Sequence, residues 1–233
     1  TGRSETASKL TKLPRLFNAK RELLAIGNLA GHDSSFYVEY NATRDNLLKV
    51  DLSQYRILHV VTHGVLDAKQ PELSGLVLSM IDANQRPIDG FVSLADIYRL
   101  RAPVDLVVLS ACNTALGERM QGEGLIGLTR GFMYAGASGV VATLWTVDDR
   151  ATAELMKQFY ANMLQRGMGP ARALREAQNY IRSQPDWSAP YFWAGFTFQG
   201  DYDLTISVAP VANERSYLRL IAGVTLIALV AIA

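Results

Sequence analysis

The sequence has little of what would indicate a disulfide, a metal site or a nucleic-acid partner. It has 1 cysteine and 3 histidines, so no internal disulfide can form, and no zinc-type spacing of ligands occurs. Charge of neither sign dominates, because 23 basic and 22 acidic residues leave a net charge of +1. Without a basic run, nucleic-acid binding is not expected. No internal repeat occurs, and no motif demands a metal ion or an organic cofactor.

The start of the chain also lacks two common features, an initial methionine and a signal peptide. We therefore expect a piece or a mature form of a longer protein. A single cysteine fits a reducing compartment. The predicted organisation is a linker over 1–12, one domain over 13–205, a second linker over 206–216 and an apolar helix over 217–233.

Within the predicted domain, apolar runs alternate with segments of helical periodicity. Strands are expected at 36–40, 57–62, 75–80, 90–93, 105–110, 139–147 and 192–200, and helices at 13–30, 43–50, 93–100, 124–136, 148–167 and 170–183. The central strands are almost continuously hydrophobic. This pattern predicts an α/β domain in which a mostly parallel sheet is covered by helices on both faces.

The end of the chain is the stretch LIAGVTLIALVAIA (220–233), which carries no charge. As a helix it would span about 21 Å, short of a hydrocarbon core of about 30 Å. A transmembrane helix over 217–233 therefore requires a thin span or a continuation beyond the chain. Arg215 and Arg219 precede the uncharged run at 220–233 and predict a cytoplasmic, membrane-anchored domain. The alternative is a buried C-terminal core helix.

The positions of the histidines and the cysteine suggest a site. His59 lies within a strand and is expected to be a hydrogen-bonded core residue, while His32 lies in a loop without a supporting pattern. His63 follows the end of one apolar run, and Cys112 follows Leu109 at the end of the next central strand. Because ligands and catalytic groups gather at the carboxyl ends of such strands, His63 and Cys112 are expected at the same edge of the sheet.

A thiol beside an imidazole is suited to nucleophilic catalysis. The imidazole accepts the thiol proton, and the thiolate attacks a carbonyl carbon. The oxyanion that forms needs preorganised donors, for which the backbone N–H groups of Gly64 and Cys112 are the candidates. The alternative is that Cys112 only packs in the core, as most single cysteines do.

Five motifs resemble those of the CHAT domain family, which groups with the caspase, separase and gingipain clan of cysteine peptidases. In order they are HVVTHG (59–64), PELSGLVLS (71–79), VDLVVLSACNTALG (104–117), GEGLIGLTRGFMYAGASGVVATLWTVDD (122–149) and YFWAGFTFQGD (191–201). The resemblance covers about residues 13–202. It implies a caspase-like three-layer α/β/α sandwich and a dyad of His63 and Cys112. It also implies an upstream region of tetratricopeptide repeats, as many relatives have.

The expected substrate pocket departs from part of this clan. Relatives that cleave after Arg or Lys often have an acid two residues before the cysteine, where this chain has Ser110. The segment TLWTVDD (143–149) lies where caspase-like enzymes line the primary pocket, so Trp145 and Asp148 are candidates for substrate contact, beside Ser110. The alternative for Asp148 and Asp149 is that they begin the next helix. Asp67 is a weak candidate to orient His63.

The stretch GEGLIG (122–127) also matches the glycine pattern of a dinucleotide-binding loop, with Asp148 downstream. Residues 111–121 separate it from the preceding strand, although the first glycine of that motif should follow its strand at once. Glu123 would also place a carboxylate where the pyrophosphate binds. Both observations argue against a nucleotide site.

The sequence therefore predicts a cysteine endopeptidase that cleaves protein substrates in a regulated signalling or defence role at a membrane. The alternative, from a different class, is a catalytically idle scaffold that uses the same fold to bind partners. The presence of both dyad residues argues against the scaffold but does not exclude it.

Overall fold

A computed structural model describes residues 16, 19–30, 34–66, 73–113, 123–145, 147–206 and 226–230 of the chain. Its strands are β1 (Ser34–Val38), β2 (Ile57–Val65), β3 (Gly75–Val77), β4 (Phe91–Ser93), β5 (Leu106–Asn113), β6 (Gly139–Thr143), β7 (Phe196–Gly200) and β8 (Leu226–Val230). Its α-helices are α2 (Ala19–Ala30), α3 (Arg44–Lys49), α4 (Leu94–Arg99), α5 (Glu123–Tyr134), α6 (Asp149–Leu164) and α7 (Pro170–Arg182). Short 3-10 turns occur at Glu39–Asn41, Leu52–Gln54, Pro185–Trp187 and Pro190–Phe192.

The described strands form one sheet in the order β1-β8-β2-β5-β6-β7, and β3 and β4 extend it beside β2. The strands β1, β8, β2, β5 and β6 are parallel, whereas β7 is antiparallel to β6. The strands expected at 75–80 and 90–93 are confirmed in shorter form as β3 and β4, which pair antiparallel as a hairpin. The expectation of a mostly parallel sheet is therefore confirmed as well.

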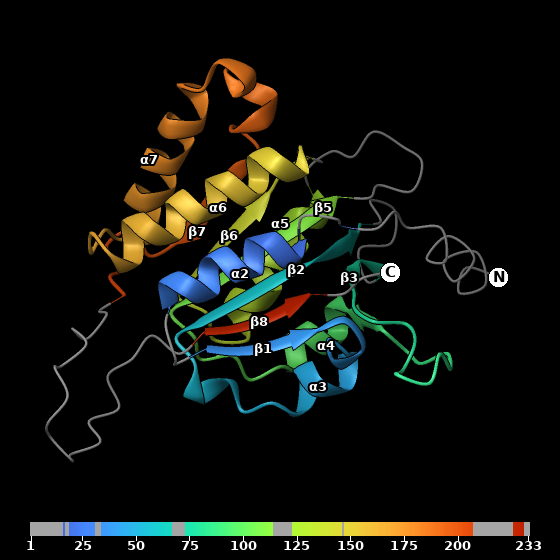
Figure 1. The fold of residues 1–233 in the computed structure, drawn as a ribbon. Coiled ribbons are helices and arrows are strands. Elements are labelled where there is room, and N and C mark those ends of the chain that lie inside the picture. The colour runs from blue at the N-terminus through green and yellow to red at the C-terminus, as the bar shows by residue number, and fades with distance from the viewer. Residues whose placement is uncertain are drawn as a thin grey trace, which may run out of the picture.

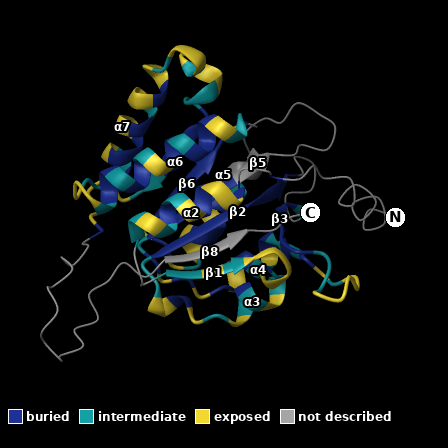
Figure 2. Cartoon of the chain, in the orientation of Figure 1, coloured by how far each residue is buried: buried dark blue, intermediate teal, exposed yellow. Residues whose placement is uncertain are grey.

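Helices cover both faces of the sheet. Figure 1 shows α2, α6 and α7 on one side, and α3 and α4 on the other. Alternate residues of β5 pack into the two layers, since Leu106 and Val108 join the α6–α7 core while Val107 and Leu109 join the α4–α5 core. Figure 2 shows β2 buried along its whole length between these layers. The arrangement is an α/β/α sandwich, as predicted.

Helix starts follow local sequence signals. Thr43 caps α3, and its hydroxyl accepts a hydrogen bond from the backbone N–H of Asn46 at 3.1 Å. Ser93 and Asp96 form a capping box at the start of α4. Pro170 occupies the first turn of α7, where a missing N–H costs no intrahelical bond.

The predicted helix at the end of the chain is wrong where the structure describes it. Residues Leu226–Val230 form β8, which lies between β1 and β2 and is parallel to both. A short, fully apolar run suits an interior strand of a parallel sheet as well as a helix, and periodicity does not separate the two. No helix among the described residues is long and apolar enough to cross a membrane. The rest of 217–233 lies outside the described residues, and the predicted limits of the domain and linkers stay predictions.

Candidate active site

The ends of β2 and β5 bring the two predicted catalytic positions together. These strands are parallel neighbours, and their register pairs His63 with Cys112 and Gly64 with Asn113. Both residues lie inside their strands, because β2 continues to Val65 and β5 to Asn113. The sequence predicted shorter strands, since polar residues and glycine resemble the start of a loop.

The histidine of this pair is enclosed. The His63 side chain is 1% exposed. Its backbone lies between two strands, because His63 pairs with Cys112 of β5 on one edge and with Val77 of β3 on the other. β2 is therefore held on both edges at this level, which fixes the backbone from which the imidazole extends.

Within the described residues, β5 at the level of Cys112 is paired with β2 but not with β6. Its last pair with β6 joins Leu109 to Ala142. From Ser110 to Asn113, the edge that faces β6 has no strand partner within the described part of the chain. Backbone groups on an unpaired edge remain available for an extended peptide or for an oxyanion.

The predicted oxyanion donors stand in different surroundings. Gly64 lies within β2, and its Cα pairs with Asn113 of β5 and with Leu76 of β3. Cys112 lies on the half-paired end of β5. The role of both N–H groups stays a prediction.

Ser110, a predicted pocket residue, contacts a helix that the sequence did not connect with the site. Its hydroxyl donates a hydrogen bond to the Glu22 carboxylate on α2, at 3.3 Å. Ser110 is 6% exposed and Glu22 is 3% exposed. Glu22 of α2 therefore brings a carboxylate to this serine from outside the strand.

His59 is a hydrogen-bonded core residue, as the sequence predicted. It is buried, its Nε2 lies 3.1 Å from the other oxygen of Glu22, and its Nδ1 lies 2.9 Å from the Tyr160 hydroxyl on α6. Burial raises the pKa of the Tyr160 phenol well above its usual value of 10.0, and the charge of Glu22 adds to this effect. The phenol is thus kept protonated.

Glu22 and Tyr160 were not predicted as part of the site. A signal for Glu22 existed, because Ala19, Glu22, Leu23 and Ile26 recur at helical spacing and together form the buried side of α2. A carboxylate among the apolar positions of such a helix indicates a buried polar partner. No comparable signal marked Tyr160, since a tyrosine in a helix is common in cores.

The other two predicted pocket residues are engaged within the fold. Trp145 is half-buried, and its indole N–H donates to the carbonyl oxygen of Tyr191 at 3.1 Å. It lies against Gly195, where an added Cβ would be 3.0 Å from the indole ring. Asp148 is the N-cap of α6 and accepts hydrogen bonds from the backbone N–H groups of Arg150 and Ala151 at 3.0 and 2.9 Å. The helix-start interpretation of Asp148 is confirmed.

The remaining candidates are settled only in part. His32 and Asp67 lie outside the described residues. The glycine pattern at 122–127 does not follow a strand directly, because β5 ends at Asn113 and α5 begins at Glu123. Within the described residues, no group of three histidine, cysteine or acidic side chains could hold a metal ion.

Comparisons with known proteins agree with the motifs. The CHAT domain family matches residues 2–201. A mouse protein (Mus musculus), tetratricopeptide repeat protein 28, is 39% identical over 109 residues, which is 47% of this chain and 4% of that protein. A human protein (Homo sapiens) with the same name is 36% identical over 109 residues, which again is 47% of this chain and 4% of that protein. This chain therefore spans only a small part of the relatives that it matches. Because the family match covers most of the chain, the chain belongs to the CHAT domain family.

Proposed function

We propose that this chain is a cysteine endopeptidase in which Cys112 is the nucleophile and His63 the general base and acid. The observation that carries the proposal is the register of β2 and β5, which places the two residues directly opposite each other. Neighbouring strands lie about 4.8 Å apart, and positions paired in register belong to the same face of a sheet. Side chains at such positions can come within hydrogen-bond distance of each other.

The reaction balances with these two residues and water. His63 takes the proton of the Cys112 thiol, and the thiolate forms a bond to the carbonyl carbon of the scissile peptide. The backbone N–H groups of Gly64 and Cys112 donate to the oxyanion. The C–N bond then breaks as the imidazolium protonates the leaving amine. Water hydrolyses the thioester and restores the thiol.

A peptide-library cleavage assay tests the proposal. We expect Cys112→Ala to abolish cleavage and to leave the fold intact by circular dichroism. His63→Gln should lower kcat/KM by about 10²- to 10⁴-fold, because it removes the general base. Val60→Ala, on the opposite face of the same strand, serves as the control for disturbing β2. Cleavage that persists in the Cys112→Ala protein would refute the assignment.

A second candidate function is a catalytically idle scaffold that binds partner proteins. The observation that favours it is the enclosure of His63, which is 1% exposed, because a general base must reach its substrate. Alkylation of the thiol separates the two functions. A thiol primed by imidazole reacts quickly near neutral pH, whereas a packed thiol reacts only when the protein unfolds.

The substrate and the setting belong to the same proposal. An extended peptide lying along the unpaired edge at Ser110–Asn113 would present its side chains to Ser110 and Trp145. An upstream tetratricopeptide-repeat region is supported by the names of the two relatives. The cytoplasmic location and the signalling or defence role stay predictions.

A further inference from the structure

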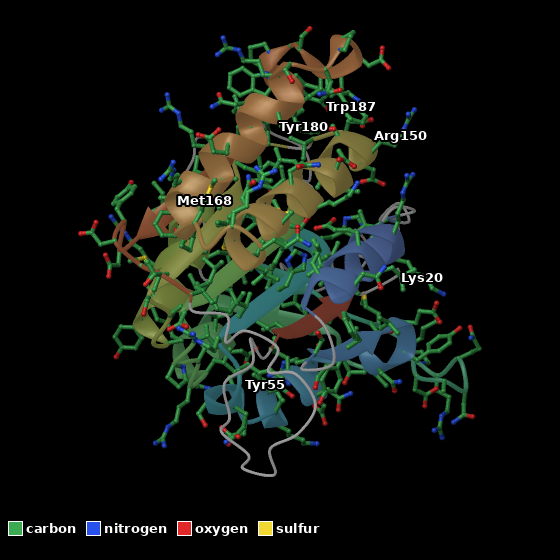
Figure 3. The ribbon with its side chains drawn as sticks, turned by 60° about the vertical axis from the view of Figure 1, so that its left-hand side comes forward. Lys20, Tyr55, Arg150, Met168, Tyr180 and Trp187 are labelled. Atoms are coloured by element: carbon green, nitrogen blue, oxygen red, sulfur yellow. The ribbon has the colours of Figure 1, made fainter. Side chains whose placement is uncertain are left out.

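A buried polar cluster joins α2 to the strand that carries Cys112. We call Glu22, Ser110, His59 and Tyr160 the Glu22 cluster. Its links are the Ser110 hydroxyl to the carboxylate at 3.3 Å, His59 Nε2 to the same carboxylate at 3.1 Å, and the Tyr160 hydroxyl to His59 Nδ1 at 2.9 Å. The cluster thus spans α2, β5, β2 and α6. Figure 3 shows α2 beside α6, with Lys20 and Arg150 pointing outward from this layer.

Burying the Glu22 carboxylate between α2 and the sheet costs free energy. A carboxylate removed from water loses hydration, which its hydrogen bonds only partly restore. No lysine or arginine among the described residues forms an ion pair with Glu22, whose two oxygens face His59 and Ser110. Apolar residues already pack elsewhere on this side of α2, at Leu23 and Ile26. Packing alone therefore does not account for a carboxylate at this position.

The location of Ser110 suggests what the carboxylate does. Ser110 lies two positions before Cys112 in β5, and alternate positions of a strand belong to the same face. Among the described residues, the pairing of β5 with β6 ends at Leu109, whereas its pairing with β2 continues to Asn113. The hydrogen bond from Ser110 to Glu22 is therefore an additional restraint on the part of β5 that is held on one edge.

We propose that Glu22 is a positioning residue for Cys112, so that the docking of α2 and the placement of the thiol beside His63 are coupled. A helix that bonds to the strand of the nucleophile holds the end of that strand when docked and releases it when displaced. The coupling is a property of the fold. It holds whether or not the chain cleaves peptides.

The test is the pH dependence of thiol alkylation by iodoacetamide. Ser110→Ala removes the bond and keeps the carboxylate, whereas Glu22→Gln keeps the shape and removes the charge. Thr129→Val is the matched control, because Thr129 is another buried hydroxyl whose bond, to Gln199 at 2.9 Å, lies away from α2 and β5. Circular dichroism and urea unfolding establish that each variant is folded during alkylation.

We expect both cluster variants to alkylate about tenfold more slowly at pH 7, with the midpoint of the rate profile moved up toward the usual thiol value of about 8.5. Thr129→Val should stay within about twofold of the unmodified chain. The direction of the shift is decisive. Removal of a nearby negative charge alone would lower the midpoint in Glu22→Gln and leave Ser110→Ala unchanged. That outcome, or an equal loss in Thr129→Val, would overturn the proposal.

Backbone hydrogen exchange keeps this test separate from the proposed peptidase. If the unmodified thiol already has an ordinary midpoint, the His63–Cys112 dyad fails, and exchange decides the coupling. Amides of 108–112 should then exchange several-fold faster in Ser110→Ala and Glu22→Gln than in Thr129→Val. Equal exchange at 108–112 in all three variants would overturn the coupling as well.

Discussion

Two histidines on one strand illustrate how neighbouring residues acquire different roles. His59 and His63 are four positions apart on β2, so both belong to the same face of the sheet. His59 is held between Glu22 and Tyr160, and its ring nitrogens are both engaged. His63 lies at the level of Cys112, where β5 no longer pairs with β6. His59 is therefore a structural residue, whereas His63 is the candidate catalytic residue because it lies beside Cys112, beyond the last pair of β5 with β6.

The Tyr160 hydroxyl contributes to stability through His59. We expect Tyr160→Phe to lower the free energy of unfolding by about 1–3 kcal/mol, because a buried ring nitrogen loses its partner while the apolar packing is kept. Urea unfolding measures the loss. Tyr202→Phe is the control, since Tyr202 is 70% exposed and its change should cost less than about 0.5 kcal/mol. Equal losses in both variants would contradict the role given to the buried hydroxyl.

The raised pKa of Tyr160 also predicts a stability loss in alkali. Below pH 10 the phenol is protonated in both states, and its contribution is fully present. Above pH 10 the unfolded chain releases this proton while burial keeps it in the folded state, so stability falls as pH rises. The slope attributable to one proton is about 1.4 kcal/mol per pH unit. The stability difference between the unmodified chain and Tyr160→Phe should therefore shrink between pH 10 and 11, and a constant difference would contradict this.

At the scale of single elements, the sequence predicted where helices begin better than it predicted where strands end. The helices expected at 43–50 and 93–100 do begin at the caps Thr43 and Ser93, because a helix start depends on side chains three residues apart. The far ends of β2 and β5 were missed. Their last residues are kept in the strand by pairing with each other and, for β2, by pairing with β3. Such pairing is long-range and leaves no local pattern.

The start of α6 allows a test of what Asp148 does. As an N-cap alone, Asp148→Ala should lower the free energy of unfolding by about 1 kcal/mol and leave KM unchanged. Asp148→Ser keeps a capping oxygen without the charge and should restore both stability and activity. Urea unfolding and peptide cleavage measure the two effects. A Ser variant that is stable but has a raised KM would show that the carboxylate meets the substrate.

At the scale of the whole molecule, the sequence predicted the layers and the shared edge but not the register of the strands. A parallel sheet with helices on both faces follows from apolar strands that alternate with helices, and this placed His63 and Cys112 at one edge. Their register could not be predicted, because it depends on how two strands align across the sheet. The hydrogen bond of Glu22 to Ser110 joins residues 88 positions apart and was equally hidden.

The end of the chain is the clearest error at this scale. The sequence predicted a helix where Leu226–Val230 forms a strand between β1 and β2. A fully apolar segment has no polar residues to mark a helical or a strand period, so its secondary structure depends on what it contacts. Two strands that each present an edge without a partner provide such a contact, because a third strand can pair with both. Only the assembled sheet contains that information.

A proline in β8 tests whether this strand completes the sheet. The Cα of Ala228 pairs with Phe36 of β1 and with His59 of β2, so its backbone lies between neighbours on both edges. Ala228→Pro removes an N–H group from the ladder and should lower the free energy of unfolding by about 1–3 kcal/mol or more. Ala228→Gly keeps the N–H and should cost about 0.5–1 kcal/mol. Amides of β1 and β2 should exchange faster in the proline variant. If the proline and glycine variants unfold alike and both strands keep their protection, β8 does not stabilise the sheet.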